Sequence, residues 1–225
     1  MRSFVRPVLV VALLVSALPA RAATSMRTAG FQLQADGLLS VPSASNVASV
    51  GASLSSLVGN GAGFALTGTI GVRPSLALGA RVAYFGSTGE HERFLIDPLA
   101  PLGVGPFHEE RRLRVTTVHA VLQHRRALGR RFEWALDLGA GVMSSRERLV
   151  LDSATGNKAS LVGVQLDPSV AVGGQFAWLA GANTDLVANL RWNGSFTTDG
   201  AVWSKDDSPS FTTWSLGLRY PHDTH

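Results

Sequence analysis

The sequence has no cysteine and almost no lysine. The lack of cysteine excludes disulfide bonds, thiolate nucleophiles and cysteine-based zinc sites. The two lysines, Lys158 and Lys205, lie in segments of loop-like composition, although a solvated outer surface usually carries many lysine and glutamate residues. Beyond residue 22 no run approaches the roughly 18 consecutive apolar residues of a membrane-spanning helix, so no transmembrane helix is predicted.

The N-terminus has the pattern of a secretory signal peptide. Residues 1–22 read MRSFVRPVLVVALLVSALPARA, with a basic start, a short apolar stretch and a small-residue cleavage pattern ending at Ala22. We predict a signal peptide over 1–22 and a mature domain over 23–225; the alternative is an uncleaved N-terminal anchor. Cleavage removes three arginines and lowers the formal charge from +4 to about +1, so the charge does not indicate nucleic-acid binding.

Alternation of apolar and polar residues with a period of two dominates the mature chain, and the helical spacing of apolar residues is rare. This pattern predicts an all-β protein. The segment at 111–124 alternates poorly and is assigned as a strand from its valine and threonine content and from its neighbours. The eight predicted strands cover 30–41, 64–72, 76–85, 111–124, 132–142, 164–178, 186–196 and 213–220.

The links between these strands alternate in length. Short links fall at 73–75, 125–131 and 179–185, and long links at 43–60, 87–110, 147–160 and 197–209. Short turns at one rim and long loops at the other are typical of an antiparallel up-and-down transmembrane β-barrel with periplasmic turns and extracellular loops. Because lipid offers no hydrogen bonds, such a sheet must close, and strand 30–41 is expected to pair with strand 210–220.

One face of the strands carries the polar residues, and we expect that face to line the lumen. Its carboxylates would be costly to bury unless they were paired. Glu133 and Asp137 are expected to pair with Arg81, Arg191 or Arg219. The interior of an eight-stranded barrel is wide enough only for side chains to fill it. The predicted lumen residues are Gln32, Gln34, Asp36, Arg81, Glu133, Asp137, Gln165, Asp167, Asn189, Arg191 and Arg219.

The aromatic residues occupy the strand positions that form the apolar face. They fall into two groups, one near each rim of the predicted barrel. Two aromatic girdles that flank an aliphatic band are typical of a protein that crosses a bilayer. The group at the short-turn rim is Phe31, Phe132, Trp134, Phe176, Trp178 and Tyr220, and the group at the loop rim is Phe64, Tyr84, Phe196 and Trp214.

Three segments carry a resemblance to a known family: GFQLQADGLL at 30–39, GVRPSLALGARVAY at 71–84 and WSLGLRY at 214–220. Across residues 30–220 the chain resembles the small outer-membrane β-barrel superfamily of Gram-negative bacteria, with its OmpA-like and OmpX-like eight-stranded members. WSLGLRY is similar to the C-terminal signal through which these proteins engage the barrel assembly machinery. It departs from the pattern because Pro221–His225 follow the terminal aromatic residue.

Some small barrels of this kind are lipid-modifying enzymes with histidine, serine and a carboxylate near a rim. No His-x-Ser pattern lies at the end of a lipid-facing strand, and we predict no catalytic residue and no cofactor. Structural or surface roles are expected for the six histidines, and His119 and His124 are expected to face opposite sides of their strand. The histidines are His91, His108, His119, His124, His222 and His225.

The long link at 87–110 raises two further possibilities. Its histidines and acids could ligate a divalent ion, but a solvated charged loop is the simpler interpretation, and no metal site is predicted. Arg111, Arg112 and Arg114 follow the link, and arginines at an outer rim can bind lipopolysaccharide phosphates or be ordinary rim charge. The acidic and histidine residues concerned are Glu90, His91, Glu92, His108, Glu109 and Glu110.

The glycines form no phosphate-binding loop, because no strand-to-helix context surrounds them. Gly71, Gly139, Gly141, Gly173 and Gly174 are expected at small lumen or bend positions.

These observations favour a non-enzymatic outer-membrane barrel that acts through its long extracellular loops, in surface contact, adhesion or envelope integrity. Its expected partners are outer-membrane lipid, lipopolysaccharide and the assembly machinery, with no nucleic acid. Two alternatives remain: an outer-membrane enzyme that modifies lipid A, and a soluble periplasmic β-barrel that binds a ligand.

Overall fold

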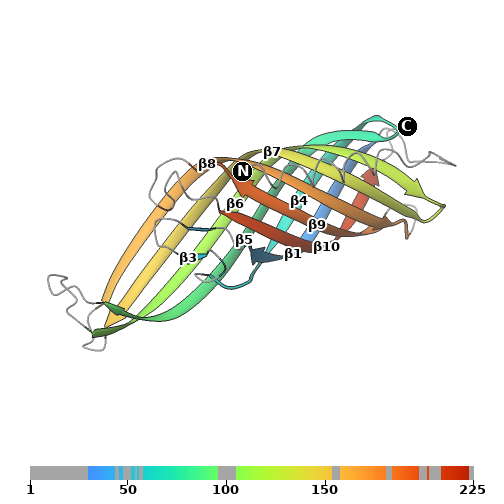
Figure 1. The fold of residues 1–225 in the computed structure, drawn as a ribbon. Coiled ribbons are helices and arrows are strands. Elements are labelled where there is room, and N and C mark those ends of the chain that lie inside the picture. The colour runs from blue at the N-terminus through green and yellow to red at the C-terminus, as the bar shows by residue number, and fades with distance from the viewer. Residues whose placement is uncertain are drawn as a thin grey trace.

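The computed structural model describes residues 30–43, 46–47, 52–53, 55, 58–95, 105–153, 158–180, 184–197, 202 and 209–222. The expected signal peptide and its cleavage site lie outside these ranges. Within them, no helix is long and apolar enough to cross a bilayer. Each of the ranges that contains a long strand contributes to one closed sheet (Figure 1).

Eight antiparallel strands close into a barrel in the order β1-β10-β9-β8-β7-β6-β5-β4, as the alternation of the sequence predicts. Two further short strands, β2 (Asn46–Val47) and β3 (Ala52–Ser53), pair within the link at 43–60. The barrel strands are β1 (Phe31–Pro42), β4 (Gly61–Arg73), β5 (Leu76–Leu95), β6 (Gly105–Leu128), β7 (Phe132–Ser153), β8 (Lys158–Trp178), β9 (Asp185–Ser195) and β10 (Ser210–His222).

The barrel closes between β1 and β10, which confirms the pairing expected from the need to satisfy every backbone group. Leu33 lies opposite Tyr220, and Leu39 lies opposite Trp214. The expected end of the last strand at Tyr220 is wrong, because Pro221 and His222 continue the ladder against Gln32 and Phe31. A proline lacks only the donor, so it fits at the end of a strand.

The link predicted at 125–131 is shorter than expected. β6 continues to Leu128 and β7 begins at Phe132, so that the turn consists of 129–131. Gly129 has a φ of +74°, a left-handed conformation that a residue without a Cβ adopts at little cost. Arg125 therefore belongs to a strand and not to a turn.

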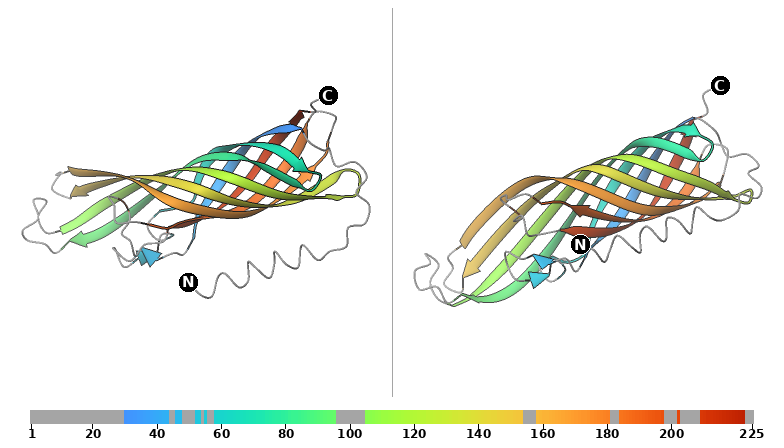
Figure 2. Two further views of the ribbon diagram at one scale, coloured as in Figure 1. Left: turned by 90° about the horizontal axis from the view of Figure 1, so that it is seen from above. Right: turned by 45° about the horizontal axis from the view of Figure 1, so that its top comes forward.

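The long links predicted at 87–110 and 147–160 are wrong for most of their length. The ladder between β4 and β5 ends at Ser87, and the ladder between β8 and β9 ends at Ser169. Strands β5–β8 extend well beyond these two points. We call the extension the protruding sheet; it consists of residues 88–95, 105–114, 144–153 and 158–168. Figures 1 and 2 show these four strands reaching far beyond the other half of the barrel. Polar residues occur on both of its faces and apolar residues such as Leu161 and Val162 are exposed, so alternation fades and the sequence resembles loops.

Side chains alternate between the two faces of the barrel wall as the pattern predicts. Leu66, Leu138 and Leu216 are 49%, 48% and 68% exposed on the outside, whereas the predicted lumen residues are buried or half-buried. Phe132 stands beside Trp178 at the short-turn rim, and Phe64 stands beside Tyr84 nearer the loop rim. The described aromatic residues of both predicted groups therefore lie on the apolar outer face.

The inner face is not polar throughout, which the sequence analysis did not anticipate. At the end of the lumen nearest the long links, an apolar plug fills the barrel. Phe85 and Phe211 meet edge to face inside it, with ring centroids 5.2 Å apart. Val202, from the link at 197–209, packs against the plug. The plug consists of Leu38, Val58, Ala65, Ala83, Phe85, Leu113, Val115, Met143 and Phe211.

Candidate functional site

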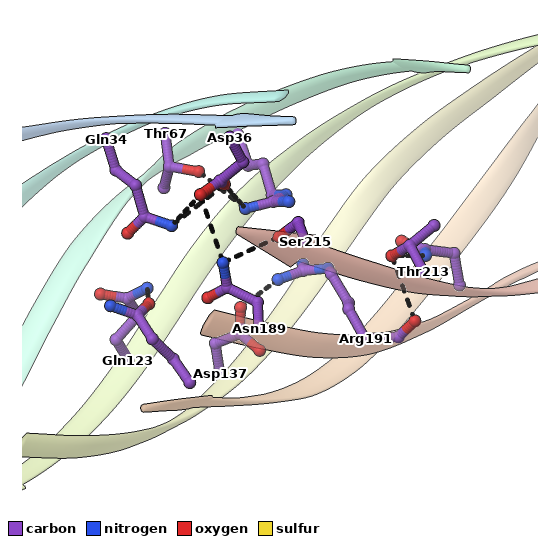
Figure 3. A network of polar contacts seen from close by, with 12 residues as sticks. Gln34, Asp36, Thr67, Gln123, Asp137, Asn189, Arg191, Thr213 and Ser215 are labelled. Atoms are coloured by element: carbon purple, nitrogen blue, oxygen red, sulfur yellow. Dashed lines mark hydrogen bonds and ion pairs between the residues drawn. The ribbon is translucent and has the colours of Figure 1, made fainter. Parts of the chain in front are cut away.

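Below the plug, the lumen is filled by a network of buried polar side chains with Asp36 of β1 as one centre. Arg81 of β5 donates to the Asp36 carboxylate at 3.1 Å and to the Thr67 hydroxyl at 3.0 Å. Gln34 and Asn189 also donate to Asp36, at 2.8 Å and 3.3 Å. Figure 3 shows Gln34 of β1 and Asn189 of β9 reaching toward the Asp36 carboxylate. The buried charge is thereby paired and hydrogen-bonded, as burial requires.

A second centre is the ion pair between Asp137 of β7 and Arg191 of β9 (Figure 3). The two strands are separated by β8, and Gly173 of β8 lies opposite both residues in the ladders. A Cβ at Gly173 would overlap the Asp137 carboxylate and approach the Leu190 carbonyl oxygen to 2.9 Å. A Cβ at Gly139 would overlap the Arg191 guanidinium. These two glycines therefore make room for the pair.

Arg219 of β10 forms the third centre with two carboxylates. It donates to Glu133 at 2.6 Å and to Asp185 at 2.9 Å and 3.0 Å. The sequence prediction that Glu133 and Asp137 pair with lumen arginines is thus confirmed. Arg81, the third arginine considered for them, pairs with Asp36 instead.

Arg125 is a lumen residue that the sequence analysis missed. Its guanidinium donates to Gln32 of β1 at 2.5 Å, to Thr69 of β4 at 2.7 Å and to Gln123 at 2.6 Å. Val121 and Gln123 precede it at the same parity and are buried, so strand parity could have placed it inside. Together, the polar contacts join side chains from all eight barrel strands.

His119 and Ser169 contact each other in the lumen, with Nε2 and Oγ 2.8 Å apart. This contact bears on the lipid A-modifying alternative, because serine and histidine can form a nucleophile and base. His119 and Ser169 are only 1% and 2% exposed, and Nδ1 of His119 has no hydrogen-bond partner among the described residues. A catalytic histidine is normally oriented at that nitrogen by a third group. His124 has the opposite parity from His119, as predicted, and its ring lies beside that of Trp134.

The arginines predicted at the outer rim divide between the two faces of the sheet. Arg111 points inward and pairs with Glu109 and, at 2.9 Å, with Glu147. Arg112 and Arg114 are exposed on the outer face. Arg111 is therefore held by carboxylates inside the wall, and the proposed lipid-facing role does not apply to it.

The residues weighed as metal ligands lie on the β5–β6 hairpin. Its register places Glu90 opposite Glu110 and His91 opposite Glu109. The side chains of His91 and Glu92 lie outside the described residues, and the described part of the chain brings together no group of three possible ligands. At the tip of the protruding sheet, the hydrogen bond from Lys158 to Asp152 raises the pKa of Lys158.

Of the five glycines predicted at lumen or bend positions, Gly139 and Gly173 lie in the lumen beside the charged pair. Gly141 packs against the backbone of β6, and Gly71 lies at an irregularity in the β4–β5 register. Gly174 is an exception: it is exposed on the outer face, and a Cβ there would meet nothing within 4 Å.

Comparison with known proteins identifies the fold. No protein-family model and no curated protein matches the chain. A major outer membrane protein from Thermus thermophilus is 14% identical with a TM-score of 0.52, over 85% of this chain and 99% of that one. The chain therefore has the fold of the small outer-membrane β-barrels, which confirms the fold class predicted from the alternation of its residues.

Two further solved structures give lower scores. Neisserial surface protein A is 15% identical with a TM-score of 0.49, over 86% of this chain and 97% of that one. The outer membrane protease OmpT from Escherichia coli is 10% identical with a TM-score of 0.46, over 90% and 99%. In each of these comparisons the match spans nearly the whole of the solved chain.

Proposed function

We propose that the chain is a non-enzymatic integral outer-membrane protein, in which a closed barrel anchors the protruding sheet outside the membrane for surface contact. The observation that carries this proposal is the contrast between the two faces of the wall. The outside is aliphatic with aromatic rims, and the inside holds ion pairs. A soluble ligand-binding barrel would need the reverse arrangement, with an apolar cavity inside and polar residues in water.

The filled lumen supports an anchor better than a channel. The apolar plug occupies one end, and the network around Asp36, Asp137 and Arg219 occupies the rest. An eight-stranded barrel has little space left once side chains fill it. We expect the purified protein to show little or no steady conductance in planar bilayers. Stable, large single-channel steps would contradict the closed lumen.

The protruding sheet is the part of the molecule suited to contact. The protruding sheet has two open edges within the described residues. No strand pairs with 89–95 of β5 on the side away from β6, and none pairs with 158–167 of β8 on the side away from β7. An open sheet edge can accept an extended segment of another protein. The inner-facing Leu161 and the outer-facing Val162 and Val164 are 64%, 55% and 60% exposed near one of these edges.

Cell fractionation tests the location, and added protease tests the topology. We expect the chain in the outer membrane, with migration in detergent gels that changes on heating. Protease added to intact cells should cut only in the long links and the protruding sheet. Recovery of the chain in the soluble periplasmic fraction would contradict the proposal and favour the soluble alternative.

A shortened variant separates contact from anchoring. Ser87 lies opposite Leu113, and Ser145 lies opposite Gln165, so each hairpin can be closed there with an Asn-Gly turn. We expect the shortened barrel to insert normally, while cells that carry it lose adhesion to surfaces and to one another. Unchanged adhesion would contradict the contact role, and increased detergent sensitivity of the cells would indicate a role in envelope integrity.

The enzyme alternative depends on His119 and Ser169, which are buried side by side. Release of an acyl chain from lipid A by the purified protein, lost in Ser169→Ala, would overturn the non-enzymatic proposal.

A further inference from the structure

Four arginines form a cluster on the outer face of β6 and β7, where the protruding sheet leaves the barrel. Arg112 lies directly opposite Arg148 in the ladder, and Arg114 lies directly opposite Arg146. All four side chains are exposed. We call these four residues the arginine quartet. Arg148 lies in the segment that the sequence analysis assigned to a loop at 147–160, and Arg146 lies just before that segment.

Within the described part of the chain, an ion pair neutralises only one of the quartet's four positive charges. Like charges that face each other across a ladder destabilise a sheet, because their Cβ atoms are only about 5 Å apart. Glu110 pairs with Arg112 at 2.5 Å. Among the described residues, no carboxylate forms an ion pair with Arg114, Arg146 or Arg148. The buried carboxylates nearby, Glu109 and Glu147, point to the inner face and are engaged with Arg111.

Along the barrel wall, the quartet lies just beyond the aliphatic band, toward the protruding sheet. Val118 and Val142 face each other in that band and are 45% and 39% exposed. Arg114 lies four residues before Val118, or roughly 13 Å away along the strand. With the tilt of barrel strands, this is about 10 Å along the membrane normal. Lipid phosphates lie at the border between hydrocarbon and water, which is where this height places the guanidinium groups.

The neighbouring strand supplies an apolar surface at the same height. Val164 of β8 lies opposite Arg146, and Leu166 lies opposite Ser144. These two side chains are 60% and 63% exposed on the outer face. An amphiphile bound here would place acyl chains against β8 and its anionic head against β6 and β7.

We infer that the arginine quartet binds the phosphate groups of an outer-leaflet lipid, namely the diphosphorylated lipid A part of lipopolysaccharide. The inference rests on the proposed membrane location. Guanidinium groups bind phosphate oxygens through paired, directional hydrogen bonds, and two arginine pairs offer positions for two phosphates. A bound phosphate also removes the repulsion between facing arginines, so the lipid and the sheet stabilise each other.

The test uses the full chain, purified in detergent micelles, and native mass spectrometry. The probes are diphosphorylated lipid A, its dephosphorylated form and inorganic pyrophosphate. We expect the wild-type chain to retain diphosphorylated lipid A at least tenfold more strongly than either other probe, with retention that falls as salt is raised. Equal retention of the dephosphorylated lipid would overturn the inference, and equal retention of pyrophosphate would show that the site takes free phosphate rather than a membrane lipid.

Variants locate the site. Arg114→Gln with Arg146→Gln removes two facing charges, and Arg130→Gln with Arg131→Gln removes two exposed charges at the turn of the opposite rim. We expect the first pair to lose retention at least tenfold and the second pair to keep it, with both still heat-modifiable. Equal retention by both variants would overturn the inference. Fractionation reports separately on the proposed location, because absence of the chain from the outer membrane would contradict the proposed function whatever the variants retain.

Discussion

Asp137 of β7 and Arg191 of β9 form an ion pair above Gly173 of β8, the residue that lies opposite both of them in the ladders. The pair neutralises one of the two acidic residues in the alternating segment at 132–142. A carboxylate on the inner face of such a strand is tolerable because a guanidinium two strands away reaches it. Facing positions on β7, β8 and β9 are therefore coupled, because the glycine on β8 leaves room for the ion pair between its two neighbours.

We expect Asp137→Ala to lower the free energy of unfolding by about 3–5 kcal/mol, because it leaves the Arg191 guanidinium buried without its partner. Urea unfolding in detergent micelles measures the change. Asp152→Ala is the control, because the Asp152–Lys158 pair is exposed and exposed pairs contribute little. A similar loss in both variants would argue against a buried network.

Adjacent glycines offer a second test. Gly173→Ala should destabilise the barrel by about 1–3 kcal/mol, because its methyl group would overlap the Asp137 carboxylate. Gly174→Ala places the same methyl group on the open outer face and should change stability by less than about 0.5 kcal/mol. The same unfolding assay compares them. Equal tolerance of the two alanines would show that the carboxylate can move aside freely.

Leu138 tests whether the outer wall meets lipid. Leu138→Arg should cost about 2–4 kcal/mol of insertion free energy if this residue lies near the middle of the bilayer. Leu161→Arg replaces an exposed leucine of the protruding sheet, outside the bilayer, and should fold into liposomes normally. Heat-modifiable migration after refolding reports the outcome. Normal insertion of Leu138→Arg would place this part of the wall in water.

Truncation tests the closure of the barrel. Deletion of 213–225 removes most of the partners that β1 has on β10, and we expect it to abolish barrel formation. We also expect the truncated chain to be degraded in the periplasm, because it would lack the C-terminal strand that resembles an assembly signal. Deletion of 223–225 keeps every ladder partner of β1 and should be tolerated. Assembly of the longer deletion would refute closure through β10.

Parity along a strand can be deduced from the sequence, and it correctly placed Asp36, Asp137 and Arg191 inside. Partner choice could not be deduced, because it depends on the register between strands that are distant in sequence. Arg81 meets Asp36 across β4 for this reason. The pattern also concealed the apolar plug. Leu38 and Phe85 have the parity of the polar residues, so their burial depends on height in the lumen, which alternation does not encode.

Strand ends were misplaced where hydrophobic alternation stops before the hydrogen bonds do. Glu109 and Arg148 lie in regular ladders, but the outer face of the sheet there carries exposed charges and the inner face holds paired carboxylates. Where polar residues occupy both faces of a strand, hydrophobicity does not alternate with a period of two. The short turns were located better, since Pro74 and Gly129 mark them directly.

The unequal strand lengths also set an order of folding. β5–β8 follow one another in the chain and pair over most of their length, so each ladder forms by closing a short loop. The seam between β1 and β10 joins Phe31 to His222, at opposite ends of the barrel domain, and loop closure costs more as the loop lengthens. We expect the β5–β8 meander to form first and the seam to close last. Pulsed hydrogen exchange during refolding should then protect the amides of Val118 and Val142 before those of Leu33 and Leu218, and simultaneous protection would contradict this order.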